Sequence, residues 1–126
     1  MLAGLVLALS GCSASASIVS IDGHETVLIT YPSSGGDSTI EGELVEIGNC
    51  IGVDSGAGPM LVLFPPGTHI TPDKDVLMES DDLFALGSEI VIVGRTAKTT
   101  TIDGHDRLPA DCLTQDAFLA QEVSEP

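Results

Sequence analysis

The sequence predicts an all-β domain, most simply a small closed barrel of five or six short strands joined by long loops. Short runs rich in Val, Ile and Leu recur along the chain, and clusters of Gly, Pro, Asn and Asp separate them. Hardly any stretch has the 3.6-residue periodicity of an amphipathic helix. An open sandwich is the alternative arrangement of the same strands.

The first strand expected in the domain is TIEGELVEI, residues 39–47. Up to Leu44, apolar residues and a glycine alternate with glutamates, which is the period of a strand with one buried face. Beyond Leu44 the apolar positions are Val45 and Ile47, and a shift of one residue turns side chains to the opposite face. We therefore expect a β-bulge near Leu44 and Val45.

Two continuous apolar runs follow, MLVLF at 60–64 and EIVIVGR at 89–95, and both are typical of buried strands. The tail AFLAQEV, 117–123, fits either a closing strand or a two-turn helix capped by Thr114, and its periodicity does not decide between them. The segments 65–88 and 95–111 are expected to be long surface loops, which in a rigid barrel are the usual place for contacts with a partner.

Residues 18–31 contain two β-prone runs around Asp22 and Gly23, a dipeptide typical of hairpin turns. This segment is either an outlying hairpin or a strand that docks on the domain, and the Ser- and Gly-rich residues 33–38 then form a linker. The domain itself is expected at 39–123, about 85 residues, a size that buries only about 60–65% of the surface of the unfolded chain.

The chain opens with an apolar run, Leu2 to Leu9, that is much shorter than the about 20 residues needed to cross a bilayer. The run fits the apolar region of a signal peptide. It ends in Leu9-Ser10-Gly11-Cys12, which resembles the lipobox of bacterial lipoproteins at all four positions.

The lipobox resemblance implies removal of residues 1–11, attachment of a diacylglyceryl group to Cys12, and a location at the outer face of the cell membrane. Residues 12–38 are then the lipidated N-terminus and a flexible tether. Two acyl chains give durable anchoring, whereas one chain gives only marginal binding.

The domain also resembles small OB-like barrels and short bacterial lipoproteins of undefined role. This second resemblance rests on LVEIGNC, LVLFPPGT, LGSEIVIVG and LPADC. It implies a small barrel and leaves the function open.

With a lipid on Cys12, two thiols remain, Cys50 and Cys112. In an oxidising compartment two such cysteines usually pair, and the alternative is two free buried thiols. The bridge would join positions 62 residues apart (112 minus 50), which the chain-entropy model values at roughly 4 kcal/mol.

Charge excludes one class of partner. The chain has 19 Asp and Glu against 4 Lys and Arg, for a net charge of −15. Because binding to DNA or RNA depends on cationic side chains at the phosphates, no nucleic-acid partner is expected. The same charge would repel an anionic membrane, so membrane attachment requires the lipid.

One motif suggests catalysis. IGVDSGAG resembles the aspartic-protease signature, and EIVIVGR resembles the apolar run ending in Gly-Arg that follows it in this family. The resemblance implies a dimeric, retroviral-type protease in which Asp54 shares a proton with its symmetry mate. Asp-Ser-Gly is also a common string in hairpin loops, which is the other interpretation.

Two further groups of side chains could bind cations. Acidic residues lie close together in the long loop and suggest a loose calcium site: Asp73, Asp75, Glu79, Asp81 and Asp82. The string Ile-Asp-Gly-His occurs at 21–24 and again at 102–105 and could supply two His and two Asp to a transition metal. An isolated His69 has no evident partner. No cofactor is indicated.

These observations favour a non-catalytic binding or accessory module, held by lipid at the outer face of the membrane and bound to an envelope protein or a polar ligand. The alternatives are the aspartic protease using Asp54 and a purely structural envelope protein.

Overall fold

The computed structural model describes residues 15–21, 23–32 and 36–126, and their fold is mostly β, as predicted. The longer strands are β1 (Ser15–Ile21), β2 (His24–Thr30), β3 (Ser38–Ile47), β4 (Cys50–Asp54), β5 (Pro59–Phe64), β9 (Glu89–Lys98) and β10 (Asp116–Ser124). Three two-residue strands, β6 (His69–Ile70), β7 (Val76–Leu77) and β8 (Leu83–Phe84), form a separate small sheet. The helical elements are three short 3-10 helices, η1 (Thr99–Thr101), η2 (His105–Arg107) and η3 (Ala110–Cys112). No helix in the described part of the chain is long and apolar enough to cross a membrane.

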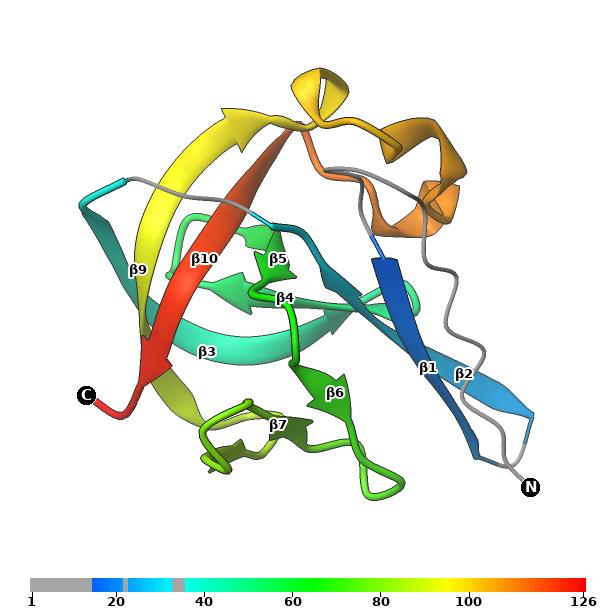
Figure 1. The fold of residues 1–126 in the computed structure, drawn as a ribbon. Coiled ribbons are helices and arrows are strands. Elements are labelled where there is room, and N and C mark those ends of the chain that lie inside the picture. Colours follow the sequence, from blue (N-terminus) through cyan, green and yellow to red (C-terminus); the bar gives the residue numbers. More distant parts are fainter. Residues whose placement is uncertain (1–14, 22, 33–35) are drawn as a thin grey trace.

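The seven longer strands form one mixed sheet whose hydrogen-bonded pairs close into a ring (Figure 1). Strand β3 pairs antiparallel with β4 and with β9, and β9 pairs antiparallel with β10. Strand β5 completes the ring, because it pairs in parallel with β10 and antiparallel with β4. The ring is not a regular barrel, because β4 and β5 pair only at their hairpin end. Beyond it, β2 fills the gap by pairing with β4 through Val27 and with β5 through Ile29 and Thr30.

The β2 pairings correct the expected start of the domain. The segment 18–31 is a hairpin, but it is not an outlying one, because β2 belongs to the large sheet and Val27, Leu28 and Ile29 are buried. The core therefore begins before residue 39, where the sequence placed the start of the domain. Part of the expected tether, Ser15–Ile21, is strand β1.

The predicted bulge in the first domain strand is wrong. Strand β3 pairs with β9 up to Glu43 and with β4 from Glu43 onward, and neither register shifts. The apolar pattern changes because both faces are covered: Leu44 is buried on one face, and Ile47 lies on the other, against Gly52. The bulge of the sheet lies in β10, between Ala120 and Glu122.

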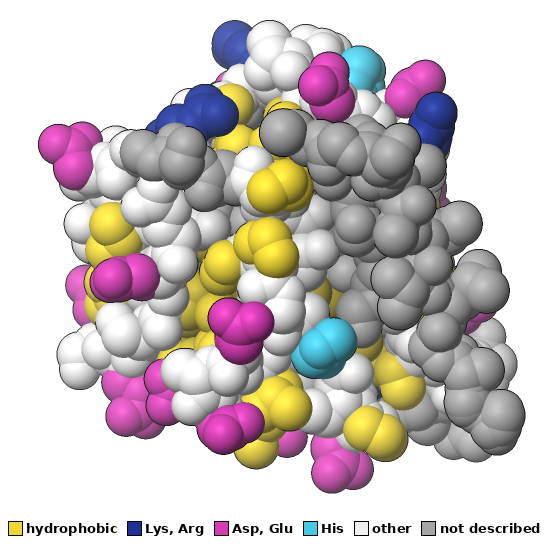
Figure 2. All heavy atoms as spheres, viewed as in Figure 1, with side chains coloured by type: hydrophobic (Ala, Val, Ile, Leu, Met, Phe, Trp, Pro, Cys, Tyr) yellow, Lys and Arg dark blue, Asp and Glu magenta, His cyan; other side chains and the backbone are white. Residues whose placement is uncertain are grey.

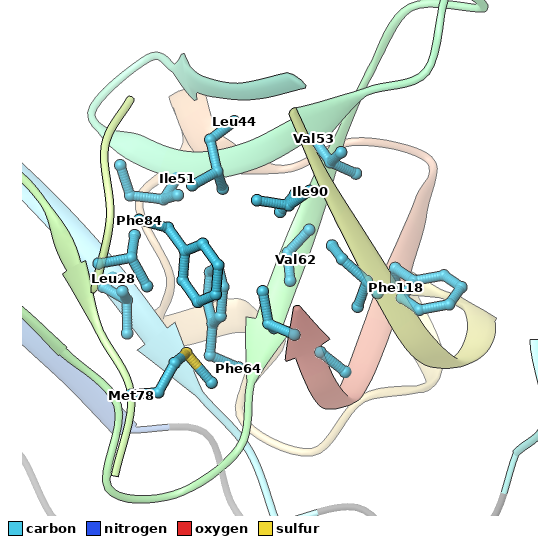
Figure 3. Packing of buried hydrophobic residues seen from close by; sticks show 14 of the residues in the cluster. Leu28, Leu44, Ile51, Val53, Val62, Phe64, Met78, Phe84, Ile90 and Phe118 are labelled. Atoms are coloured by element: carbon cyan, nitrogen blue, oxygen red, sulfur yellow. The ribbon is translucent and has the colours of Figure 1, made fainter. Parts of the chain in front are cut away.

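Two hydrophobic clusters explain why some strands have apolar side chains on both faces. One fills the inside of the ring, where Phe64 and Phe118 are its largest fully buried side chains (Figure 3). The other covers the outer face of β2, β5 and β10 and contains both half-cystines. Along β5 the side chains alternate between the clusters, Leu61 and Leu63 in the outer one and Val62 and Phe64 in the inner one. This explains the continuous apolar run at 60–64.

The segment 65–88, expected to be a surface loop, contributes to the inner cluster. The small β6–β7–β8 sheet buries Ile70, Val76, Met78 and Phe84 there. Figure 3 shows Met78 and Phe84 pointing toward Phe64. Much of the loop thus closes one end of the ring.

The tail whose structure the sequence left open is strand β10, Asp116–Ser124, so the helix alternative is excluded. Residues 117–120 are buried on both faces, which a two-turn helix at the surface would not require.

Candidate functional site

The disulfide predicted between Cys50 and Cys112 is present, with 5.4 Å between the two Cα atoms. Both residues are fully buried. Cys50 begins β4, and Cys112 ends the third 3-10 helix of the segment 99–115. The bond therefore fixes this segment, which we call the cap, to the outer face of the sheet.

Hydrogen bonds hold both ends of the cap. The Thr99 hydroxyl donates to the carbonyl of Thr114 at 2.5 Å, and the Thr99 amide donates to the carbonyl of Gln115 at 3.1 Å. The amide of Leu61 donates to the Thr114 hydroxyl oxygen at 3.0 Å, so Thr114 links the cap to β5. Ile102 of the cap is buried in the outer cluster. Most residues of segment 95–111 are nevertheless exposed, as expected of a surface loop.

Asp54 lies at the end of β4, in the hairpin that leads to β5. Its Oδ1 accepts a hydrogen bond from the Gly56 amide at 2.8 Å, which is the geometry of an Asx turn. Gly56 and Gly58 have φ of 105° and 108°, so the string Asp-Ser-Gly-Ala-Gly supplies the conformations that the turn needs. Asp54 therefore has a structural role that accounts for its position.

Substitution of Asp54 separates the contribution of its hydrogen bond from that of its negative charge. Asp54→Asn keeps the oxygen that accepts from Gly56 and should leave stability within about 0.5 kcal/mol, whereas Asp54→Ala removes the acceptor and should lower the free energy of unfolding by about 1 kcal/mol. Urea unfolding of the two variants tests this. An equal loss in both variants would show that the negative charge, and not the hydrogen bond, matters at this position.

The acidic residues proposed for calcium are spread over the small sheet and its turns. Asp73 and Asp75 flank the turn before β7, whereas Glu79, Asp81 and Asp82 lie in the turn after it. The Ser80 hydroxyl donates to Asp82 Oδ2 at 3.0 Å. In the part of the chain that the structure describes, no three His, Cys, Asp or Glu side chains are arranged to hold a metal ion.

The two Ile-Asp-Gly-His strings are used differently. His24 on β2 contacts Glu46 through Nε2 and Oε2 at 3.0 Å, and the buried Thr26 hydroxyl donates to the same carboxylate oxygen. His105 Nδ1 instead lies 2.8 Å from the carbonyl oxygen of Ile102, inside the cap. His69 is exposed on β6. The first histidine thus ties β2 to β3, and the second closes a turn.

An open groove lies at the end of β10, and no sequence pattern indicated it. It has a volume of about 390 Å³ and lies between the start of segment 65–88, the turn after β7, and the end of β10. Its lining residues are Pro65, Pro66, Thr68, Met78, Glu79, Ser80, Asp82, Gln121, Glu122, Val123 and Ser124. A second hollow of about 250 Å³ shares Asp82 and Ser124 with it, so the two are contiguous.

Charge is unevenly distributed around this groove. Residues 78–82 and 121–125 contain five carboxylates and no Lys or Arg. Three of the four cationic residues, Arg95, Lys98 and Arg107, instead lie at the end of β9 and in the cap. In Figure 2 the visible Lys and Arg side chains are all in the upper part, where some Asp and Glu also lie, whereas the lower part shows Asp and Glu without Lys or Arg.

Cys12, the expected lipidation site, lies outside the described residues. No protein-family model, curated protein or solved structure shows a significant match to this chain. Its function must therefore be argued from its own residues.

Proposed function

We propose that this chain is a lipid-anchored, extracytoplasmic binding module of the bacterial cell envelope, without catalytic activity. The observation that carries the binding role is the groove at the end of β10. Its described lining combines apolar side chains with carboxylates and contains no His, Cys or Lys. Apolar contact and ion pairs are the usual means by which a binding surface holds a partner, and this lining supplies both.

The strand pairing supports the OB-like assignment as the finer description of the fold. The ring β3–β4–β5–β10–β9 consists of a three-stranded meander, a strand that returns to β3, and a last strand that joins β5 in parallel. OB-folds are five-stranded Greek-key barrels that commonly bind ligands on the face of their second and third strands. Here the outer face of the corresponding β4 and β5 is covered by the cap, so a ligand needs another surface.

The anchor follows from the lipobox and agrees with the position of the first strand. Ser15, where β1 begins, follows Cys12 by three positions (15 minus 12), so a lipid on Cys12 would hold the domain close to the bilayer. Strand β1 begins near the cap and far from the C-terminus in Figure 1, and its Ile18 packs on the outer cluster. The nearly neutral cap end would then face the membrane and the acidic groove the aqueous side.

Substitution of Cys12 tests the anchor. Cys12→Ser removes the thiol that receives the diacylglyceryl group, and we expect the protein to leave the membrane fraction almost completely. Membrane and soluble fractions of cells grown with radiolabelled palmitate would be compared by immunoblot and autoradiography. The physical reason is that without acyl chains the acidic domain gains no energy from an anionic surface.

A matched control is Ser10→Ala, which preserves the lipobox as Leu-Ala-Gly-Cys. This variant should stay labelled and membrane-bound. Retention of unlabelled Cys12→Ser in the membrane fraction would remove the lipid anchor from the proposal.

A further inference from the structure

The groove exists because the ladder between β5 and β10 stops early. These strands pair only from Ala117 to Leu119 on β10, opposite Leu61 to Leu63. Continued in register, the next partners on the β5 side would include Pro65 and Pro66, and proline has no backbone N–H to donate. Among the described residues, no strand pairs with Glu122–Ser124 on the side away from β9.

The open edge of β10 therefore forms one wall of the groove. On its other side, Glu122–Ser124 pairs with Val93–Val91 of β9, so the edge is held in strand geometry by the sheet. An exposed edge with regular geometry is a template for another strand.

Apolar surface lies beside this edge. Pro65, Pro66, Met78 and Val123 contribute apolar surface to the groove. Leu83, in the adjoining hollow, is the most exposed of the large hydrophobic side chains that the structure describes, at 56%. Leu83 thus extends the apolar surface of the groove, and contiguous apolar surface of this kind is typical of places that contact another protein.

The charges of the groove restrict the charge that a partner segment can carry. Glu79, Asp82 and Glu122 line it, and Glu125 lies in the adjoining hollow. The Glu79 carboxylate lies over the backbone of Gly67, where a Cβ would be 2.8 Å from Oε2. Because like charges across an interface are strongly unfavourable and opposite charges are favoured, this lining disfavours an acidic segment and favours one with Lys or Arg.

We propose that an extended segment of another envelope protein, with basic and apolar side chains in alternation, docks in this groove as a short strand along Glu122–Ser124. Side chains of a strand alternate between faces. In the docked segment, apolar side chains next to the buried Val123 would contact the groove floor. Its basic side chains next to the exposed Glu122 would contact the Glu122 carboxylate. This inference rests on the proposed function, since it names the class of partner that the binding module recognises.

The test uses the purified full-length protein in a non-ionic detergent and a fluorescein-labelled probe, acetyl-Lys-Val-Lys-Val-Lys-Val-Lys-amide. Fluorescence anisotropy at low ionic strength should show saturable binding. The counterpart in which Glu replaces every Lys should not bind. A probe with N-methyl groups on every backbone amide between its residues keeps charge and side chains but removes N–H donors from both edges of the strand. It should bind at least about tenfold more weakly, because main-chain hydrogen bonds supply affinity in strand addition.

Matched charge variants locate the site. Glu79→Lys with Asp82→Lys and, in the cap, Asp103→Lys with Asp106→Lys alter net charge equally, and all four residues are exposed. The groove pair should weaken binding by at least about tenfold, while the cap pair should weaken it by less than about threefold, since a distant charge is screened. Circular dichroism and thermal unfolding would verify that both variants fold.

Hydrogen exchange gives a readout that simple charge attraction would not produce. The bound probe should slow exchange of backbone amides within Glu122–Ser124. Equal weakening by the groove and cap pairs, equal affinity for the N-methylated probe, or self-association abolished by the groove pair would each overturn the proposal, the last in favour of a second copy of this chain. Because probe binding does not need the lipid, its failure is distinguishable from failure of the anchor.

Discussion

Removal of the Cys50–Cys112 disulfide is expected to lower the free energy of unfolding by about 4 kcal/mol, the value that the chain-entropy model gives for a bridge between residues 62 apart. That loss is a large fraction of the stability of a small domain. In this fold the bond also joins the cap to the start of β4 across the buried outer cluster, so its loss affects the packing of the cap. Urea unfolding of the double variant Cys50→Ala with Cys112→Ala, against the oxidised protein, measures the difference.

The reduced protein without substitution is the control for the two alanines. It should unfold at nearly the same urea concentration as the double variant if the covalent link itself provides the stability. Hydrogen exchange should show that the cap opens first, because Ile102 and Leu108 then depend on packing alone. A loss below about 1 kcal/mol would mean that packing and the bonds of Thr99 and Thr114 hold the cap without the bridge.

The all-β fold class could be predicted because it depends on local sequence patterns, and the disulfide could be predicted from the number of cysteines in the chain. Continuous apolar runs at 60–64 and 89–95 are strands, and the two cysteines other than Cys12 are paired. The bulge expected at Leu44 and Val45 was wrong for a reason that lies outside the strand. A change of apolar face indicates a bulge only where one face is covered. Here Leu44 is buried on one face, and Ile47 packs on the other face against Gly52 of the neighbouring strand β4.

The candidate groove could not be predicted, because its parts come from three distant segments. A local signal is Pro65-Pro66, which follows the last residue of β5. Its consequence, an unpaired edge at Glu122–Ser124, depends on the parallel pairing of β5 with β10. The acidic residues of 73–82 were noticed as a possible cation site, but the turn conformations spread them apart, and only Glu79 and Asp82 line the groove.

Gly94→Ala is expected to be among the most damaging single substitutions in the chain. Gly94 lies in the middle of the ring, between Ser38 of β3 and Ala120 of β10. A Cβ at this position would lie 1.9 Å from the carbonyl oxygen of Leu119. That atom belongs to the backbone of a strand paired on both sides, so β9 and β10 must separate next to the β10 bulge. Overpacking costs typically about 1–3 kcal/mol and occasionally more, and we expect at least about 3 kcal/mol here.

Gly56→Ala provides the comparison, because it separates steric overlap from backbone conformation. Gly56 has φ of 105° and nothing within 4 Å of its added Cβ, so only conformational strain, about 1–2 kcal/mol, should appear. Gly94 has no positive φ, so alanine there meets overlap without that strain. Urea unfolding of both variants should therefore rank Gly94→Ala as the more destabilised. The reverse order would mean that β9 and β10 can move apart at little cost.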